Sequence, residues 1–113
     1  MTSRKLFVLK LKPGHAEEVA ALFAEHDRGD MPAEVGLTRR TLFRFHDLYF
    51  HLAEGPEDLL ERLGKARDRP DFRSIDTELD AHLERYDPAT WRDLKDSMAT
   101  PFYTWSADPG TPA

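Results

Sequence analysis

The first part of the chain combines one short apolar run with one helical repeat of apolar positions. Residues 5–11, KLFVLKL, are largely apolar and are followed by Pro13 and Gly14, a pattern that predicts a buried strand. Apolar side chains then recur at helical spacing, and two glutamates precede them where the start of a helix favours negative charge. We therefore expect a helix over about residues 15–27, with Gly14 as its N-cap. The apolar positions of this helix are Val19, Leu22 and Phe23, and the glutamates are Glu17 and Glu18.

Two apolar runs joined by two residues predict a β-hairpin in the middle of the chain. Residues 28–36 contain glycine and proline, which predicts a loop, and residues 37–45 and 48–53 are then typical of strands around His46 and Asp47. With a tight turn there, directly opposed residues share one face of the sheet. One face is almost wholly apolar and contains the pairs Phe45–Leu48, Phe43–Phe50 and Thr41–Leu52. The other face is mixed and contains the pairs Arg44–Tyr49, Leu42–His51 and Arg40–Ala53.

The second half of the chain predicts two helical segments and a final strand. Gly55-Pro56 is expected to open the first segment, because proline is tolerated in the first turn of a helix. The second segment follows Pro70. Residues 102–106, FYTWS, are then expected to form a strand before a disordered tail over residues 108–113. The apolar positions of the two segments are Leu59, Leu60, Leu63 and Ala66, then Phe72, Ile75, Leu79 and Leu83.

The order strand, helix, strand, strand, helices, strand predicts an α+β fold of the ferredoxin-like type, βαββαβ. A chain of 113 residues fits one domain, which we expect to span residues 1–107. A domain of this size buries a modest core, so a cavity for a substrate would compete with core packing for apolar residues. Association with a second copy would ease that competition. The fold alone assigns no function.

Composition narrows the classes of partner. A net charge of −5 argues against nucleic acid, because phosphate binding requires an excess of lysine and arginine. Cysteine is absent, which excludes disulfides and thiolate nucleophiles and is compatible with a reducing cytoplasm. No apolar run approaches the length of a membrane span, and no signal-peptide cleavage pattern follows the N-terminal apolar stretch. We expect a cytoplasmic protein without a membrane partner.

Two polar residues end the predicted first helix. His26 continues the apolar stripe of Val19 and Phe23, so its side chain should face the sheet rather than water. The alternative interpretation is a partly buried histidine that hydrogen-bonds a backbone carbonyl. Asp27 stands at the helix C-terminus, where a carboxylate opposes the helix dipole at a cost of about 0.3–1 kcal/mol. Such placement sometimes marks function, and its alternative is a frayed helix end with Asp27 in solvent, paired with Arg28.

The mixed face of the predicted hairpin gathers the other polar candidates. His51 opposes Leu42 and lies diagonal to Arg40, and Tyr49 shares the same face. A covered face with these side chains needs polar partners or an anionic ligand. The Arg40 guanidinium presents a planar fork of donors that suits a carboxylate or enolate oxygen. The alternatives are an exposed sheet face with a Tyr–Arg contact and, for Arg40, a surface ion pair.

The sequence gives no support for a metal or nucleotide site. The five histidines show no H-x-x-x-H spacing, so we expect no bound metal, although His26, Asp27 and His51 would be the ligands if one bound across the fold. A dinucleotide-binding glycine motif, a phosphate-binding Walker loop and a serine-hydrolase elbow are also absent.

Three stretches of the chain carry a resemblance to a known family. They are AEHD (residues 24–27), LTRRTLFRFHDLYFHL (residues 37–52) and LKDSMATPFYTWSA (residues 94–107), and the similarity continues through ERLGKARDRPDF (residues 61–72). In these stretches the sequence resembles the tetracenomycin-type aromatic polyketide cyclase family, and the match covers nearly the whole chain. The resemblance implies a homodimer of the dimeric α+β barrel type, packed sheet against sheet. It also implies a pocket between helices and sheet, and no cofactor.

The resemblance also implies a reaction and a site. The reaction is a late intramolecular aldol cyclisation with dehydration of a partly cyclised aromatic polyketide, a lyase reaction of antibiotic biosynthesis. The family's proposed site maps onto His26, Asp27, Arg40 and His51. Arg40 would anchor a carboxylate or enolate, with Tyr49 as a further substrate contact. One histidine would act as base and acid while the other polarises the acceptor carbonyl, and Asp27 would orient an imidazole or bind a phenol.

Two other functions are compatible with this sequence. One is a cofactor-free monooxygenase of the same fold that acts on an anthrone-like polyketide, which oxygen uptake would reveal. The other is a non-catalytic accessory protein of a polyketide synthase, which turnover by the purified protein would exclude.

Overall fold

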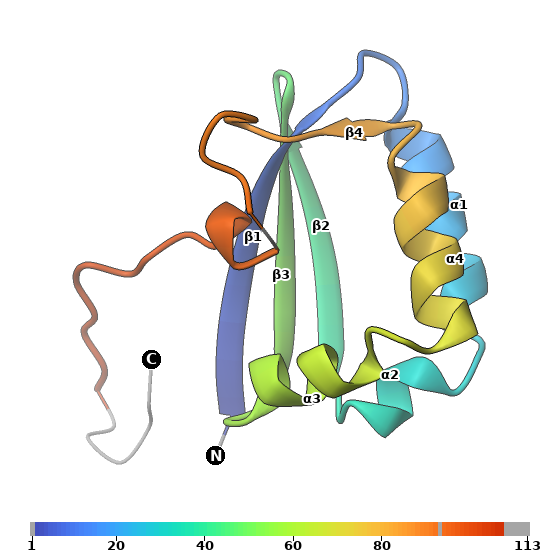
Figure 1. Ribbon diagram of the computed structural model, residues 1–113. Helices are drawn as coiled ribbons and strands as arrows, with labels where there is room; N and C mark the ends of the chain where they lie inside the picture. The colour runs from blue at the N-terminus through green and yellow to red at the C-terminus, as the bar shows by residue number, and fades with distance from the viewer. Residues whose placement is uncertain (1, 93, 108–113) are drawn as a thin grey trace.

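The computed structural model describes residues 2–92 and 94–107 and consists of one antiparallel sheet with helices packed against it (Figure 1). In chain order the elements are β1 (Thr2–Leu11), α1 (Ala16–His26), α2 (Met31–Glu34), β2 (Arg39–Phe45), β3 (Leu48–Pro56), α3 (Leu59–Ala66), α4 (Pro70–Leu79), β4 (Leu83–Glu84) and the 3-10 helix η1 (Leu94–Ser97). The strand order is β2-β3-β1-β4, and each neighbouring pair is antiparallel. The predicted ferredoxin-like α+β fold is therefore confirmed.

The predicted hairpin is confirmed in its register. β2 and β3 pair around a two-residue turn, and His46 in this turn has a φ of 54°. Such turns require positive φ, which explains why this residue departs from ordinary strand geometry. The observed pairs include Phe45–Leu48, Phe43–Phe50, Leu42–His51 and Arg40–Ala53. β1 pairs with the other edge of β3 and places Phe7 opposite His51, so His51 lies on a strand that is flanked on both sides.

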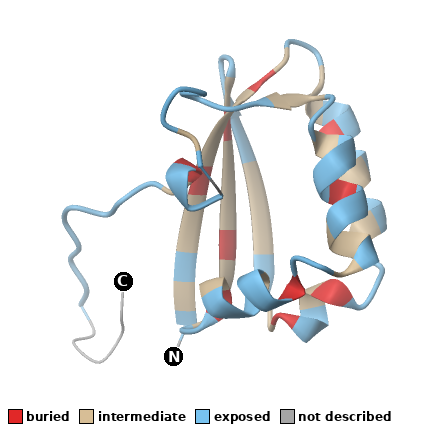
Figure 2. Ribbon diagram, viewed as in Figure 1, coloured by how far each residue is buried: buried red, intermediate tan, exposed pale blue. Residues whose placement is uncertain are grey.

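The core lies between the helices and one face of the sheet (Figure 2). One cluster, around α1 and α4, consists of Leu11, Val19, Phe23, Tyr49 and Ile75. The other, around α2 and α3, consists of Phe7, Met31, Val35, Ala53, Leu59 and Ala66. Burial of each large apolar side chain contributes about 1.5–3 kcal/mol. The two clusters together fix the helices over the mixed face of the hairpin.

Three element boundaries differ from the prediction. Gly14 is not the N-cap of α1, a position that His15 takes, and its φ of 78° instead turns the chain between β1 and α1. The expected loop over residues 28–36 contains α2, a single turn with a proline near its start. Pro56 does not open a helix but ends β3 opposite Thr2, because β1 is longer than predicted and pairs with β3 to its end.

The predicted final strand is wrong. Residues 102–106 form no strand, and their aromatic side chains are 73–99% exposed. The fourth strand is β4, in which Leu83, expected within a helix, pairs with Leu11. The neighbouring edge of β1 is occupied at Leu6, whose carbonyl accepts a hydrogen bond from the Ala99 backbone N–H at 2.8 Å. The segment that follows therefore runs beyond the sheet (Figure 1), and the predicted tail, residues 108–113, lies outside the described residues.

The apolar face of the hairpin is turned away from the helices. Phe43 and Phe45 are 50% and 63% exposed, whereas Tyr49 and Ala53 on the opposite face are buried. The division into one apolar face and one mixed face thus holds, and the mixed face is the covered one. Within the described chain, no helix has the length and apolar character needed to cross a bilayer.

Candidate active site

Arg40 forms the centre of a polar cluster on the covered face of the sheet. It lies on β2, and its side chain is only 11% exposed. Its Nε donates to Asp27 Oδ2 at 3.0 Å, and its Nη2 donates to Asp27 Oδ1 at 2.8 Å. Its guanidinium also stacks over the Phe23 ring, 4.5 Å from the ring centroid. The guanidinium is therefore held by a bidentate ion pair along its edge and by an aromatic ring against its face.

Asp27 has a clear partner that explains its position at the end of α1. Its backbone N–H donates to the Phe23 carbonyl at 2.8 Å, so the helix is not frayed there. The expected alternative of an ion pair with Arg28 is wrong, because Arg28 bonds Glu25 at 3.1 Å. Both Asp27 carboxylate oxygens instead accept from Arg40. The ion pair considered as the alternative for Arg40 is thus present, but the arginine is mostly buried rather than at the surface.

His51 contacts the third nitrogen of the Arg40 guanidinium. The Arg40 Nη1 atom lies 3.0 Å from His51 Nε2. Because a guanidinium only donates hydrogen bonds, this nitrogen must accept, which places the proton of the neutral ring on Nδ1. The ring sits among Phe7, Phe23 and Tyr49, with centroid distances of 5.7, 5.2 and 6.3 Å. Burial, assisted by the Arg40 charge, lowers the pKa of His51 to about 3, so the imidazole is neutral at physiological pH.

His26 is the last residue of α1 and directly precedes Asp27. Its Nε2 atom is buried and has no hydrogen-bond partner within residues 2–92 and 94–107, so no backbone carbonyl satisfies this nitrogen. Burial first, and the Arg40 charge second, lower the pKa of the imidazole, which Asp27 partly opposes. A buried polar atom without a partner is uncommon in proteins and calls for an explanation. Here it leaves one ring nitrogen available for a ligand.

Tyr49 lies deeper in the core than the other candidates. Its side chain packs in the cluster with Val19 and Phe23 and is buried. Burial raises the pKa of the phenol, which Arg40 opposes only in part, so the hydroxyl stays protonated at neutral pH. A role for Tyr49 as a substrate contact stays a prediction.

Four of the five predicted site residues are connected by contacts, and the fifth, His26, directly precedes Asp27 at the end of α1; the four are Asp27, Arg40, His51 and Tyr49. Two aromatic residues join this cluster. Arg40 touches both Asp27 and His51, and its charge acts on His26. Phe23 and Phe7, which the sequence analysis assigned only to the core or to a strand, form apolar contacts with this cluster. The position of Phe23, three residues before His26 on the same helical stripe, was the available signal.

Other parts of the described surface do not supply the predicted pocket or a metal site. One hollow lies between the β1–α1 connection and the hairpin turn, and another lies beside α3 and α4; neither is lined by His26, Asp27, Arg40 or His51. A pocket over those residues stays a prediction. Among residues 2–92 and 94–107, no three histidine, aspartate or glutamate side chains are arranged to hold a metal ion.

Comparisons with known proteins find relatives that match almost the whole chain. Tetracenomycin F2 cyclase of Streptomyces glaucescens is 49% identical over 107 residues, which cover 95% of this chain and 97% of the relative. The solved structure of that cyclase matches with a TM-score of 0.86 and 48% identity, covering 94% of this chain and 99% of the other. Polyketide synthase CurG of Streptomyces cyaneus is 37% identical over 103 residues, which cover 91% and 96% of the two chains.

More distant structures share only the fold. An antibiotic biosynthesis monooxygenase matches with a TM-score of 0.51 and 18% identity, over 72% of this chain and 86% of the other. The family model described as polyketide synthesis cyclase, in contrast, matches residues 3–106. Because this match and the 49% identical relative each span almost the entire sequence, the chain belongs to the polyketide synthesis cyclase family.

Proposed function

We propose that this protein is an aromatic polyketide cyclase that closes a ring of a partly cyclised polyketide by intramolecular aldol condensation followed by loss of water. The observation that supports this most directly is the convergence of His26, Arg40 and His51. A histidine nitrogen without a partner lies in the field of a guanidinium that Asp27 and His51 hold in place. This arrangement can move a proton and stabilise an oxyanion within one site.

The first step needs only a mild base. A carbon between two carbonyl groups is already acidic, so the imidazole of His26 can remove its proton, and burial keeps that imidazole neutral and able to accept. The resulting enolate carbon then attacks the acceptor carbonyl carbon, which forms the new carbon–carbon bond. His26 returns this proton to the acceptor oxygen, which becomes a hydroxyl group. The carbon that attacked then loses its second proton to the imidazole while the hydroxyl group takes up a proton and leaves as water, and the new double bond makes the ring aromatic. These steps involve no net oxidation, so they require no redox cofactor and belong to the lyase class.

The two histidines have different assignments in this proposal. His51 Nε2 already accepts from Arg40, and a pKa of about 3 makes this imidazole a poor proton acceptor at neutral pH. We therefore assign His26 as the base and later the acid. His51 then holds Arg40, and its Nδ1–H is available to polarise the acceptor carbonyl. The Arg40 guanidinium stabilises the enolate oxygen.

The same proposal includes a homodimer that acts in the cytoplasm. The outer face of β2 exposes Phe43 and Phe45, and an apolar patch of this kind on a sheet often marks an association surface. Packing two copies sheet against sheet would cover these side chains and leave the helix-covered site of each copy on the outside.

The test of this function is turnover of a purified partly cyclised polyketide by this protein alone. We expect a product that has lost one water molecule, with no uptake of oxygen. Oxygen uptake and a product with an added oxygen atom would indicate the monooxygenase. No turnover under conditions in which tetracenomycin F2 cyclase converts its own substrate, over a panel of ring patterns, would favour the accessory role. Replacement of His26 by alanine is expected to lower turnover about 10²–10⁴-fold, the usual contribution of a positioned acid–base group.

A further inference from the structure

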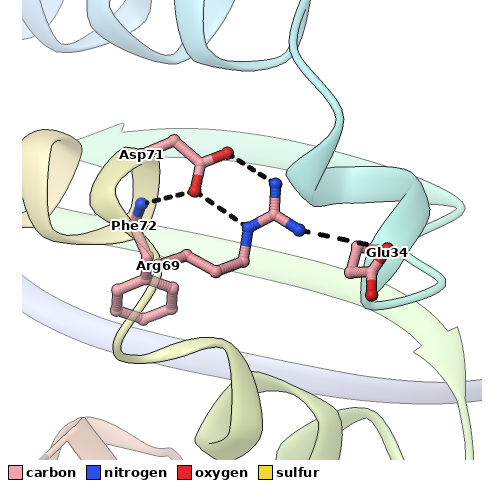
Figure 3. A network of polar contacts seen from close by, with 4 residues as sticks. All are labelled: Glu34, Arg69, Asp71 and Phe72. Carbon is pink, nitrogen blue, oxygen red and sulfur yellow. Dashed lines mark hydrogen bonds and ion pairs between the residues drawn. The ribbon is translucent and has the colours of Figure 1, made fainter.

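A second arginine–aspartate pair lies at the start of α4 (Figure 3). Arg69 Nε donates to Asp71 Oδ1 at 3.0 Å, and Arg69 Nη2 donates to Asp71 Oδ2 at 2.9 Å. Asp71 Oδ1 also accepts from the Phe72 backbone N–H at 2.9 Å, which ties the carboxylate to the first turn of the helix. Glu34 of α2 lies 3.9 Å from Arg69 Nη1. Several contacts therefore fix this pair, unlike a lone ion pair between two mobile side chains.

This second pair acts on the same histidine as the first. α4 packs against α1, and the charges of Asp71 and Arg69 both reach His26 at the end of α1. His26 acts on Asp71 in turn. The other charged groups that act on His26 are Arg40 from β2 and its own neighbour Asp27. The imidazole therefore lies in the fields of two ion pairs, each with a two-pronged hydrogen-bonded geometry.

We propose that Arg69 and Asp71 are positioning residues of this active site, which hold the α4 side of the space around His26 as Arg40 and Asp27 hold the sheet side. This inference rests on the proposed role of His26 and extends it to a pair of residues that the site did not include. The intact pair presents two opposite charges whose effects on the pKa of His26 oppose each other. Its function would be to fix α4 against α1 while keeping the imidazole neutral and its free nitrogen accessible.

Loss of one member of the pair has a signature that a purely structural role lacks. In Asp71→Asn the positive charge of Arg69 is left uncompensated, so the pKa of His26 should fall. In Arg69→Gln the negative charge of Asp71 is left uncompensated, so the pKa of His26 should rise. A general loosening of the protein would instead move the pKa in both variants toward the ordinary value for histidine. The two variants thus predict shifts of opposite sign.

The experiment measures the His26 titration by NMR and kcat for cyclisation as a function of pH, in the full chain. His26→Gln identifies the resonance. The matched control is Asp68→Asn with Arg73→Gln, because these residues form an exposed ion pair at 3.0 Å around the same end of α4. We expect shifts of the His26 pKa in opposite directions in Asp71→Asn and Arg69→Gln, and kcat lowered roughly tenfold in each. When both substitutions are combined, the His26 pKa should lie close to that of the unaltered protein. The control variants should match the unaltered protein.

The inference would be overturned if the His26 pKa in Asp71→Asn and Arg69→Gln matched that of the control or shifted in the same direction in both. An unchanged kcat in these two variants would also overturn it. Circular dichroism establishes folding first. If Asp71→Asn does not fold, Arg69→Lys takes its place, since it keeps the charge but loses the planar fork; kcat must then fall while the His26 pKa stays near that of the unaltered protein. The NMR titration does not depend on turnover. Failure of the proposed function would show as an inactive unaltered protein, whereas failure of this inference would show in the titration.

Discussion

The guanidinium of Arg40 carries five N–H donors on three nitrogen atoms, and each nitrogen makes one hydrogen bond in this cluster. Two are bound by the Asp27 carboxylate and one lies against His51 Nε2. A long side chain that is fixed in this way loses little further freedom when a substrate oxygen arrives, so its charge is preorganised. The same contacts distinguish the two histidines. His51 Nε2 accepts a hydrogen bond from Arg40, whereas His26 Nε2 has no partner among the described residues.

The carboxylate of Asp27 should be needed for catalysis through Arg40 rather than through direct contact with substrate. In Asp27→Asn the two-pronged ion pair is lost, so Arg40 is free to move. We expect kcat/KM for cyclisation to fall roughly 10- to 100-fold with the fold retained. The matched control is Glu25→Gln, an exposed acid two residues earlier that pairs with Arg28. Equal activity of the two variants would show that Asp27 does not position Arg40.

The buried imidazole of His51 should make stability depend on pH. Its pKa is about 3 in the folded protein against 6.5 in the unfolded chain, so protonation favours unfolding. The stabilisation is complete above about pH 6.5 and is lost as pH falls toward 3, with a slope of at most about 1.4 kcal/mol per pH unit for this one proton.

Urea unfolding at several pH values between 7 and 4 measures this effect. His51→Asn removes the group, so its free energy of unfolding should fall less steeply with acid than that of the unaltered protein. His46→Asn, which replaces an exposed histidine in the hairpin turn, is the control and should keep the original slope. A slope unchanged in His51→Asn would mean that His51 is not protected from protons in the folded state.

At the scale of residues, the sequence predicted which side chains of the site face the helices or the sheet. It did not predict which of these side chains contact one another. The apolar stripe of α1 predicted that His26 faces inward, and the hairpin register predicted that Arg40 and His51 share a face. The contact between Asp27 and Arg40 depends on how α1 is docked over β2, which no local pattern encodes. The effect of Arg69 and Asp71 on His26 depends in the same way on the packing of α4 against α1.

At the scale of elements, the hairpin and the two long helices followed from pattern because each has one buried face. A one-residue slip in β2 or β3 would turn the mixed face outward, so the register is strongly determined. The final strand was mispredicted because aromatic composition alone predicts a strand, whereas residues 102–106 pair with no strand of the described sheet. The edge of β1 is taken by β4 and by the chain near Met98. Availability of an edge is a property of the tertiary structure.

The packing of α3 gives a stability prediction at this scale. Leu59 at the start of α3 is fully buried in the cluster with Phe7 and Val35. Leu59→Ala should therefore lower the free energy of unfolding by about 2–5 kcal/mol, from lost burial and the cavity left behind. Leu94→Ala is the control, since Leu94 is 40% exposed and should cost much less. Similar losses in both variants, measured by urea unfolding, would contradict the placement of α3 over the core.

The whole molecule presents two contrasting faces. Helices cover the face of the sheet that carries the polar cluster, while the other face leaves phenylalanines of β2 exposed. Because a sheet in water normally covers its apolar face, the uncovered one is the expected contact between copies. In such a dimer, the sheet of each copy would pack against the sheet of the other copy through the face opposite its polar cluster.

A carboxylate placed on this open face should prevent association. Phe43→Glu with Phe45→Glu would bury charge without a partner in the contact. By analytical ultracentrifugation we therefore expect a monomer for this variant and a dimer for the unaltered protein. Ser74→Glu adds the same charge on the exposed side of α4 and should leave the dimer intact. A double variant that still dimerises would place the interface elsewhere.

The most direct test of the account is a crystal structure of the protein with a bound aromatic polyketide product. We predict an oxygen atom of the product within hydrogen-bond distance of the Arg40 guanidinium, and the ring formed in the reaction within reach of His26 Nε2. A product bound only in the hollow beside the hairpin turn, with the cluster around Arg40 closed and dry, would contradict it.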